Sequence, residues 1–213
     1  MKKRILNLSA VALIAAVSVL TGCKKDDTTA PVVTITGTDK TVSLQGTYTE
    51  EGATAEDNKD GKLNAVVGGD VVDVNRTGTY NVVYTATDAA GNVGTAKRVV
   101  TVVNDADYLT GSYNCTITGA PPTYTQTVTA STTKNNRIGF GKFSNYVNNI
   151  NIYADVAGTT ITLPSQTAIA VGSPAADRVF AGTGHIVTGG FSMNYTETTG
   201  GTTTPWEEFF VKL

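Results

Sequence analysis

The feature that most constrains the fold is a two-residue alternation of side-chain character that recurs along the chain. In its clearest run, Gly78–Ala86, the residues Tyr80, Val82, Tyr84 and Ala86 occupy every second position. Successive side chains of a strand point to opposite faces, so this period predicts half-buried β-strands. Only 16% of the residues are charged, and Thr, Val, Gly, Tyr and Asn are abundant, which favours strands and turns. The sequence therefore predicts an all-β protein.

Residues 1–22 have the pattern of a secretory signal. Three basic residues, Lys2–Arg4, precede the apolar run Ile5–Leu20. The run is shorter than the ~20 residues that a membrane-spanning helix needs, so an export signal is favoured over that alternative. Leu20-Thr21-Gly22-Cys23 follows and resembles the lipobox of bacterial lipoproteins. This resemblance implies that Cys23 is lipidated after cleavage and that the acyl chains attach the protein to a membrane without spanning it.

The residues after Cys23 predict a tether, residues 23–30, and a cellular location. Lys24-Lys25-Asp26-Asp27 resembles the export tag of Bacteroidetes surface lipoproteins. The residue that follows Cys23 is Lys24, so the aspartate typical of inner-membrane retention is missing. The resemblance implies lipid anchoring in the outer membrane with the chain facing the cell surface. The alternative is a solvated tether whose charges are accidental.

Residues 31–104 are expected to form an antiparallel β-sandwich, because short alternating runs are separated by turn residues. The polar segment Glu50–Gly61 ends in a turn at Lys59-Asp60-Gly61. The predicted strands are Val32–Thr36, Thr41–Gln45, Val71–Val74, Gly78–Ala86 and Thr95–Val103.

A tyrosine-corner pattern assigns this sandwich to a class. Gly78, Tyr80 and Val82 form the Gly-x-Tyr-x-Val sequence of strand F in immunoglobulin-like domains. Together with Ala30–Ile35, Gly52–Asn58 and Tyr84–Asn92, they make the segment similar to bacterial Ig-like domains of surface proteins and pesticidal crystal proteins. The resemblance implies a spacer or adhesive module without catalysis. Tyr80 is then structural, with a buried ring and its hydroxyl bound to backbone, and Val82 stands where antibody domains place a cysteine.

Residues 105–213 are expected to form a second β domain of about eight strands. Short connections favour an antiparallel meander that closes into a barrel or a curled sheet, and such a barrel either encloses a ligand or is filled by its own side chains. Leu109–Tyr113 resembles the Gly-x-Trp/Tyr motif of lipocalin-like barrels, and the segment is similar to uncharacterised C-terminal domains of Bacteroidetes lipoproteins. Cys115 alternates with Tyr113 and Ile117 on one strand face and is predicted to be core. The strands are expected near 109–118, 123–131, 136–144, 147–155, 159–164, 178–187, 190–198 and 206–212.

The sequence contains no nucleophile elbow, phosphate-binding loop or metalloprotease motif, and His185 is its only histidine. We therefore expect no enzyme activity and no cofactor. Gly139 and Gly141 are interpreted as glycines that let a strand bend. The net charge of −2 leaves no basic surface for nucleic acid. The acids Glu56, Asp57, Asp60 and Asp88 raise the question of calcium, but Lys59 stands where an Asp-x-Asp-x-Asp loop needs an acid, so solvated turns without metal are predicted.

Binding is the remaining function, and aromatic residues are its candidates. Tyr124, Tyr146, Tyr153 and Trp206 lie near predicted loops or strand ends, where their rings offer flat apolar faces to a glycan or protein ligand. The alternative is that these rings fill the core or cover its ends. The sequence predicts a non-enzymatic surface lipoprotein for adhesion or capture. The competing hypothesis is an architectural subunit that docks onto another envelope protein.

Overall fold

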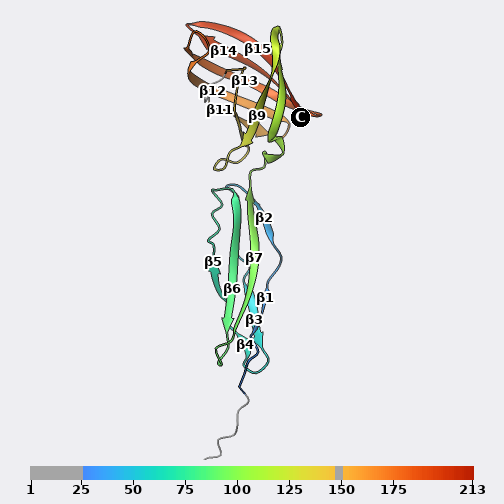
Figure 1. The fold of residues 1–213 in the computed structure, drawn as a ribbon, viewed down its shortest axis with the longest axis vertical. Coiled ribbons are helices and arrows are strands. Elements are labelled where there is room, and N and C mark those ends of the chain that lie inside the picture. The colour runs from blue at the N-terminus through green and yellow to red at the C-terminus, as the bar shows by residue number, and fades with distance from the viewer. Residues whose placement is uncertain (1–25, 147–150) are drawn as a thin grey trace, which may run out of the picture.

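The computed structural model describes residues 26–146 and 151–213, and in this part of the chain the fold is all-β, as predicted (Figure 1). The export signal and Cys23 lie outside the described residues. No helix within them is long and apolar enough to cross a membrane. The strands are β1 (Val32–Ile35), β2 (Lys40–Ser43), β3 (Ala53–Asp57), β4 (Gly61–Leu63), β5 (Val66–Gly69), β6 (Gly78–Thr87), β7 (Val93–Val103), β8 (Gly111–Ile117), β9 (Ala120–Ala130), β10 (Arg137–Phe140), β11 (Ile152–Ala157), β12 (Thr160–Val171), β13 (Ala176–Val187), β14 (Gly190–Thr199) and β15 (Thr202–Lys212).

The first seven strands form a sandwich of two sheets. One sheet has the order β1-β3-β4, and the other has the order β2-β7-β6-β5, in which β2 runs parallel to β7. The inward residues of β6 and β7, above all Val82, Tyr84 and Val100, form the small apolar core between the sheets. The Tyr80 ring is half buried, and its hydroxyl lies 3.0 Å from the carbonyl oxygen of Asp73 and 2.9 Å from that of Arg76.

The predicted strand Val71–Val74 is wrong. The chain leaves the sheet at Gly69, which has a φ of 78°, and Val71 is 89% exposed. β5 takes the expected place beside β6 instead. The segment described from its sequence only as polar contains β3, whose inward positions Ala53 and Ala55 are small and give little hydrophobic contrast.

The prediction of solvated turns is also wrong for two of the acids in this sandwich. Asp57 at the end of β3 and Asp88 directly after β6 are only 5% and 7% exposed. Both carboxylates accept hydrogen bonds from the backbone of the turns that follow them, which brings them inward.

The last eight strands form a closed antiparallel barrel in meander order, because β15 pairs with both β14 and β8. β15 is therefore hydrogen-bonded to a neighbouring strand on both sides. The short 3-10 helix η1 (Asp107–Leu109) precedes β8, and Leu109 and Ala106 join the barrel core. β10 ends at Phe140 rather than near residue 144, and the bend that follows turns Phe143 into the barrel.

Aromatic side chains fill the barrel interior. Phe191 and Phe210 stack with their ring centroids 4.3 Å apart, and Phe143 packs 4.7 Å from Tyr195. Of the two alternatives for the barrel, the filled interior is the one observed. A ligand site on this part of the chain must therefore be sought on the outside of the barrel or at its ends. The largest buried side chains of the interior are Tyr113, Phe143, Phe180, Phe191 and Phe210.

The two parts meet end to end in an elongated molecule (Figure 1). The side chain of Asn104, which follows β7, donates to the carbonyl oxygens of Ser131, Lys134 and Arg137 at 2.9–3.1 Å. Across the joint, the amide of Thr77 donates to the Thr132 carbonyl oxygen over 2.9 Å. These bonds hold the loop between β9 and β10 against the end of the sandwich.

Candidate functional site

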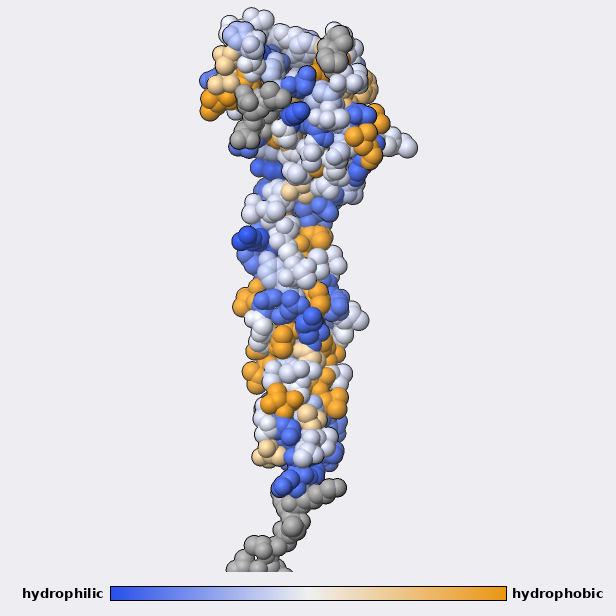
Figure 2. Space-filling view, viewed as in Figure 1, coloured by the Kyte–Doolittle hydropathy of each residue, from blue (hydrophilic) through white to orange (hydrophobic). Residues whose placement is uncertain are grey.

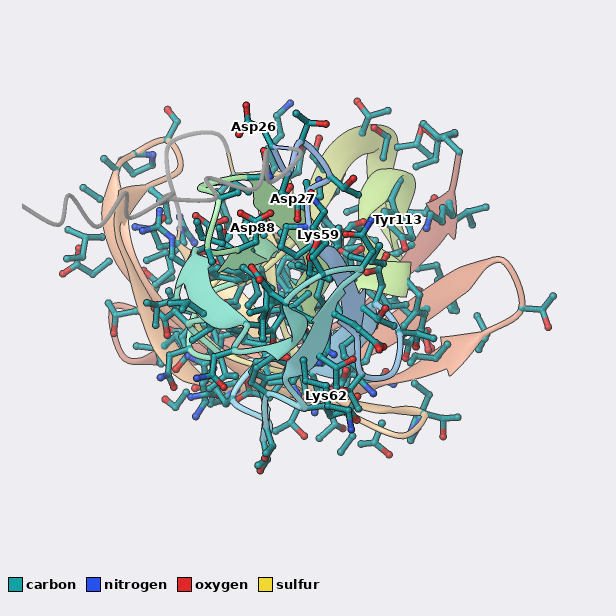
Figure 3. All side chains as sticks on the ribbon, turned by 90° about the horizontal axis from the view of Figure 1, so that it is seen from below. Asp26, Asp27, Lys59, Lys62, Asp88 and Tyr113 are labelled. Carbon is teal, nitrogen blue, oxygen red and sulfur yellow. The ribbon has the colours of Figure 1, made fainter. Side chains whose placement is uncertain are left out.

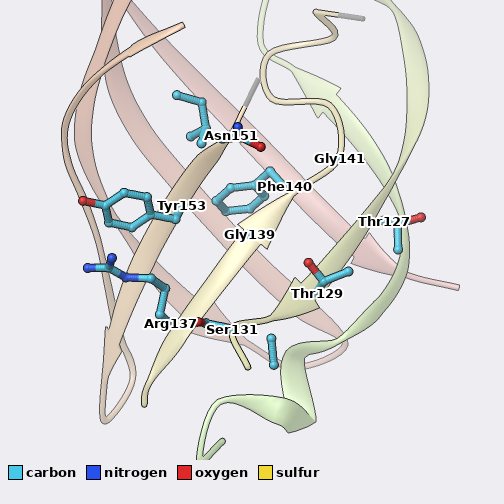
Figure 4. Close-up of a pocket in the computed structure, with 11 residues that line it drawn as sticks. Thr127, Thr129, Ser131, Arg137, Gly139, Phe140, Gly141, Asn151 and Tyr153 are labelled. Carbon is cyan, nitrogen blue, oxygen red and sulfur yellow. The ribbon is translucent and has the colours of Figure 1, made fainter. Parts of the chain in front are cut away.

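A groove runs along the outside of the barrel over β9, β10 and β11 (Figure 4). Strand alternation produces it, because Val128, Phe140 and Ile152 point into the core while their neighbours point outward. In Figure 4, Tyr153 and Arg137 lie on one side of β10 and two threonines on the other. The groove has a volume of about 330 Å³. Its polar and aromatic lining includes Thr127, Thr129, Ser131, Arg137, Asn151 and Tyr153.

Two glycines keep this groove open. The strand register places Gly139 opposite Thr129 on β9 and opposite Tyr153 on β11. A Cβ atom on Gly139 would lie 3.5 Å from Thr129 Oγ1, which is an ordinary contact, so the backbone does not require glycine here. Gly139 and Gly141 leave space between two rows of side chains, and Gly141 also begins the bend that follows β10.

The aromatic wall of the groove is rigid and electrically neutral. The Arg137 guanidinium carbon lies 3.6 Å from the centroid of the Tyr153 ring. Arg137 also pairs bidentately with Asp155, with Nε 2.7 Å from Oδ1 and Nη2 2.9 Å from Oδ2. Such forked pairs fix the guanidinium in one orientation. The hydrogen bonds to Asp155 raise the pKa of Arg137, and the opposite charges of this salt bridge balance each other.

The other three predicted aromatic residues lie elsewhere, at the end of the barrel far from the sandwich. Tyr124, Tyr146 and Trp206 are half buried and pack against the barrel core. The Tyr124 hydroxyl donates to Glu208, and the Tyr146 hydroxyl donates to Glu197 Oε1 over 2.9 Å. The structure thus separates Tyr153 from the other three rings, and those three cover the barrel end instead of standing free together.

Glu208 is the centre of a buried polar cluster at this barrel end. Its side chain is 0% exposed and accepts hydrogen bonds from Tyr124 and Tyr195, the second over 3.1 Å. Burial raises the pKa of Glu208 to about 7, although these hydrogen bonds oppose the shift. Glu208 is not among the site residues predicted from the sequence. The available signal was its spacing of two residues from both Trp206 and Phe210, which places all three on one face of β15.

The surroundings of Cys115 and His185 indicate no catalytic role for either side chain. Cys115 is fully buried, with its Sγ 3.5 Å from Gln126 Nε2, and burial raises its pKa to about 12. A thiol with such a pKa is protonated at neutral pH and is a weak nucleophile. His185 is exposed on β13, opposite Thr160 and Ser192.

Residues 33–102 match the family described as bacterial surface protein, Ig-like domain, in agreement with the resemblance found in the sequence. A search of curated proteins finds no match. Among solved structures, the chain is similar to a lipoprotein from Bacteroides thetaiotaomicron with 17% identity and a TM-score of 0.34, over 85% of this chain and 100% of that one.

Two further similar structures come from the ZmpB protein of Clostridium perfringens. One contains CBM51-2 in complex with GlcNAc together with INT domains, at 13% identity and a TM-score of 0.29, over 85% of this chain and 43% of that one. The other contains the M60 catalytic domain with CBM51-1 and CBM51-2, at 15% identity and the same TM-score, over 85% of this chain and 21% of that one. The chain thus spans less than half the length of either ZmpB structure.

Proposed function

We propose that this chain is a non-enzymatic surface lipoprotein whose barrel binds a neutral glycan in the groove along β10. One observation carries the proposal: Tyr153 stands beside an outward-facing trough lined by threonine hydroxyls and the Asn151 amide. Sugars bind aromatic ring faces through their C–H surfaces, and hydroxyl and amide groups recognise their O–H groups. The neutral Arg137–Asp155 pair favours an uncharged ligand over an anionic one.

The domain order supports presentation of this groove away from a membrane. Our proposed boundaries are residues 1–22 for the signal, 23–30 for the lipidated tether, 31–104 for the Ig-like spacer and 105–213 for the binding barrel. The tether Lys24–Ala30 reaches at most about 25 Å at ~3.5 Å per residue. The Ig-like part would then stay near the outer membrane, and the barrel would be the outermost element.

The anchor is tested by replacing Cys23 with serine. We expect the Cys23→Ser chain to leave the membrane fraction while wild type stays in it, because the thiol that carries the acyl chains is gone. Cell fractionation with an antibody against the barrel measures this. A Cys23→Ser chain that still sediments with the outer membrane would show that the anchor assignment is wrong.

The groove is tested with a glycan array probed by the full chain, followed by affinity measurements on any glycan that binds. We expect Tyr153→Ala to weaken binding about tenfold or more, since the loss of one stacked ring costs ~1.4 kcal/mol or more. Gly139→Val should also weaken it, because the new side chain fills the groove without straining the backbone. Tyr108→Ala is the matched control, since Tyr108 is exposed on η1 and outside the groove.

Two results would refute the groove proposal. One is wild-type protein that binds no glycan on the array. The other is a glycan whose affinity is the same for wild type, Tyr153→Ala and Gly139→Val. Thermal unfolding of each variant shows whether a loss of affinity comes from a loss of structure.

One observation favours the second candidate, an architectural subunit. β5 pairs only with β6 and forms an open sheet edge, and its residues Val66 and Val67 are 65% and 58% exposed. Open edges of this kind accept strands from other proteins. Against it, hydrophobic residues on the face drawn in Figure 2 are scattered among polar ones rather than joined into a flat patch. Stoichiometric co-purification with one envelope protein, lost on Val67→Lys, would favour this function over glycan binding.

A further inference from the structure

Three aspartates from different segments meet at the end of the sandwich far from the barrel. Asp27 precedes β1, Asp57 ends β3 and Asp88 follows β6. One carboxylate oxygen from each lies within 4.8 Å of the other two. Figure 3, which looks at this end of the molecule, shows Asp27 and Asp88 together with Lys59.

One oxygen in this cluster is buried without a partner. Asp57 Oδ1 accepts the amide protons of Lys59 and Asp60 at 2.8 and 3.0 Å, but Asp57 Oδ2 is buried and has no hydrogen-bond partner among the described residues. Asp57 as a whole is only 5% exposed, so water has little access to this oxygen. A buried carboxylate oxygen left without a donor or cation is costly and therefore rare. The position of Asp57 Oδ2 thus calls for a positive group.

Hydrogen bonds fix the position of the two nearly buried carboxylates. Asp88 Oδ1 accepts the amide protons of Ala90 and Asn92 at 2.9 and 2.8 Å, and Asp88 Oδ2 accepts from the Asn92 side-chain amide at 2.7 Å. The fold thus holds Asp57 and Asp88 in place beside a third carboxylate, that of Asp27.

We propose that Asp27, Asp57 and Asp88 bind a calcium ion. The donor set is oxygen only, which suits Ca²⁺ or Mg²⁺ rather than zinc or copper. Oxygens that lie within 4.8 Å of one another can contact a single ion. Ca²⁺ accepts several carboxylates in a flexible geometry, whereas Mg²⁺ keeps most of its waters and is usually bound through one or two carboxylates. Three carboxylates from separate segments therefore favour calcium.

Lys59 does not take a ligand position in this site. Its Nζ lies 3.5 Å from Asp27 Oδ1, so it balances part of the charge at the solvent side of the cluster. In the sequence, Lys59 argues against an Asp-x-Asp-x-Asp calcium loop, because it stands where such a loop needs an acid. The proposed site draws its ligands from three separate segments, so it needs no acid at position 59.

Calcium would also fasten the start of the chain to the sandwich. The Asn92 side-chain amide already donates to the Asp27 carbonyl oxygen over 3.0 Å. A metal bond to the Asp27 carboxylate would leave only residues 24–26 between this fixed point and Cys23. This consequence, unlike the site itself, rests on the proposed lipid anchor. The spacer would then be stiff at its membrane end when calcium is abundant outside the cell.

The site is tested by calcium titration of the full chain in detergent after treatment with a chelator. Isothermal titration calorimetry should detect one Ca²⁺ per chain with a dissociation constant of about 0.1–1 mM, the usual range of extracellular modules. In 10 mM CaCl₂ the melting temperature of the sandwich should rise by about 5 °C or more relative to chelator, because the ion binds only the folded state. MgCl₂ at the same concentration should produce a much smaller rise.

Asp57→Asn and Asp88→Asn should abolish both the binding and the rise in melting temperature. Asparagine keeps the Oδ1 acceptor for the turn amides, so the variants are expected to fold. Asp70→Asn is the control, since Asp70 caps the Asn81 amide away from the cluster. The proposal is overturned if wild type shows no calcium binding, or if Asp57→Asn binds calcium as wild type does. An equal response to Mg²⁺ would overturn the assignment to calcium.

Discussion

The sandwich and the barrel are both built from antiparallel strands, but their interiors differ in kind. The barrel encloses stacked and edge-on aromatic rings, whereas the sandwich buries the charged side chain of Arg98 completely, at 0% exposure. Several sandwich strands have only three to five residues, so little apolar surface is available between its sheets. The comparison indicates that a thin sandwich supplements its small core with a buried polar network.

That network is centred on Glu50. Arg98 Nη1 lies 2.7 Å from Glu50 Oε1, and the hydroxyls of Tyr48 and Tyr84 donate to the same carboxylate. Arg98 also donates to the Thr36 carbonyl oxygen of the loop after β1, which ties the two sheets together. Burial, together with the Glu50 charge, raises the pKa of Tyr84 to about 12.

The largest expected effect is on the aromatic interior. Phe210→Ala removes a ring that is stacked on Phe191 and should lower the free energy of barrel unfolding by about 4 kcal/mol. Trp206, the only tryptophan, lies in the barrel, so its fluorescence reports barrel unfolding in urea. Circular dichroism follows the unfolding of both parts, and the urea midpoint of the sandwich transition should not change. If both transitions shift together, the two regions unfold as one unit, which would contradict the view that each is stabilised by its own interior.

The polar interior of the sandwich should respond differently. Arg98→Met leaves the Glu50 carboxylate without its cation and should cost the sandwich about 3 kcal/mol. The double variant Arg98→Met, Glu50→Gln should lose less than the single variant, because the unpaired charge is gone too. Calorimetric unfolding of both variants measures this. Additive losses would show that the ion pair is not what stabilises the sandwich.

The sequence predicts the strands of the barrel better than those of the sandwich. The long strands β13 and β14 were predicted within about two residues, and in β14 the large apolar residues Phe191, Met193 and Tyr195 mark one face. β3 and β5 were missed, since their positions are filled mostly by small and polar residues or lack a clear alternation. The Arg98–Glu50 pair joins positions 48 residues apart in the sequence, and periodicity carries no information about such pairings.

For both candidate sites, the sequence indicates some of the residues but not how the fold brings them together. Gly139 and Tyr153 were both noticed, but the groove between them depends on the register of β9, β10 and β11, which sequence patterns do not give. Asp57 and Asp88 were noticed as possible ligands. The third member, Asp27, lies in the segment expected to be tether, so only the folded chain brings it to the other two.

The buried carboxyl group of Glu208 makes the stability of the barrel depend on pH. The pKa of Glu208 rises from 4.5 unfolded to about 7 folded because the group is buried. Below pH 4.5 both states are protonated and no penalty exists. As the pH rises from 4.5 to 7 only the unfolded state ionises, so stability falls, and the penalty is complete above pH 7.

We therefore expect the barrel to lose roughly 2–3 kcal/mol of stability between pH 5 and pH 8, because each tenfold difference in proton affinity between the two states corresponds to about 1.4 kcal/mol. Trp206 fluorescence in urea at each pH measures the effect. Glu208→Gln should flatten this dependence, while the calorimetric sandwich transition serves as the internal reference. A barrel that is equally stable at pH 5 and pH 8 would contradict the buried, ionisable Glu208.

The smallest effect is kinetic and reports opening of the barrel separately from opening of the sandwich. Cys115 is the one cysteine of the described residues, and it is fully buried in the barrel with a pKa raised to about 12. In a Cys23→Ser chain, a thiol reagent should leave native protein unlabelled and should react only when the barrel opens. Arg98→Met, which weakens the sandwich, should leave the labelling rate unchanged, whereas Phe210→Ala should raise it several-fold or more. Rapid labelling of the native Cys23→Ser chain would show that the barrel end near Cys115 admits solvent, and an acceleration by Arg98→Met would show that opening of the sandwich spreads into the barrel through the Asn104 joint.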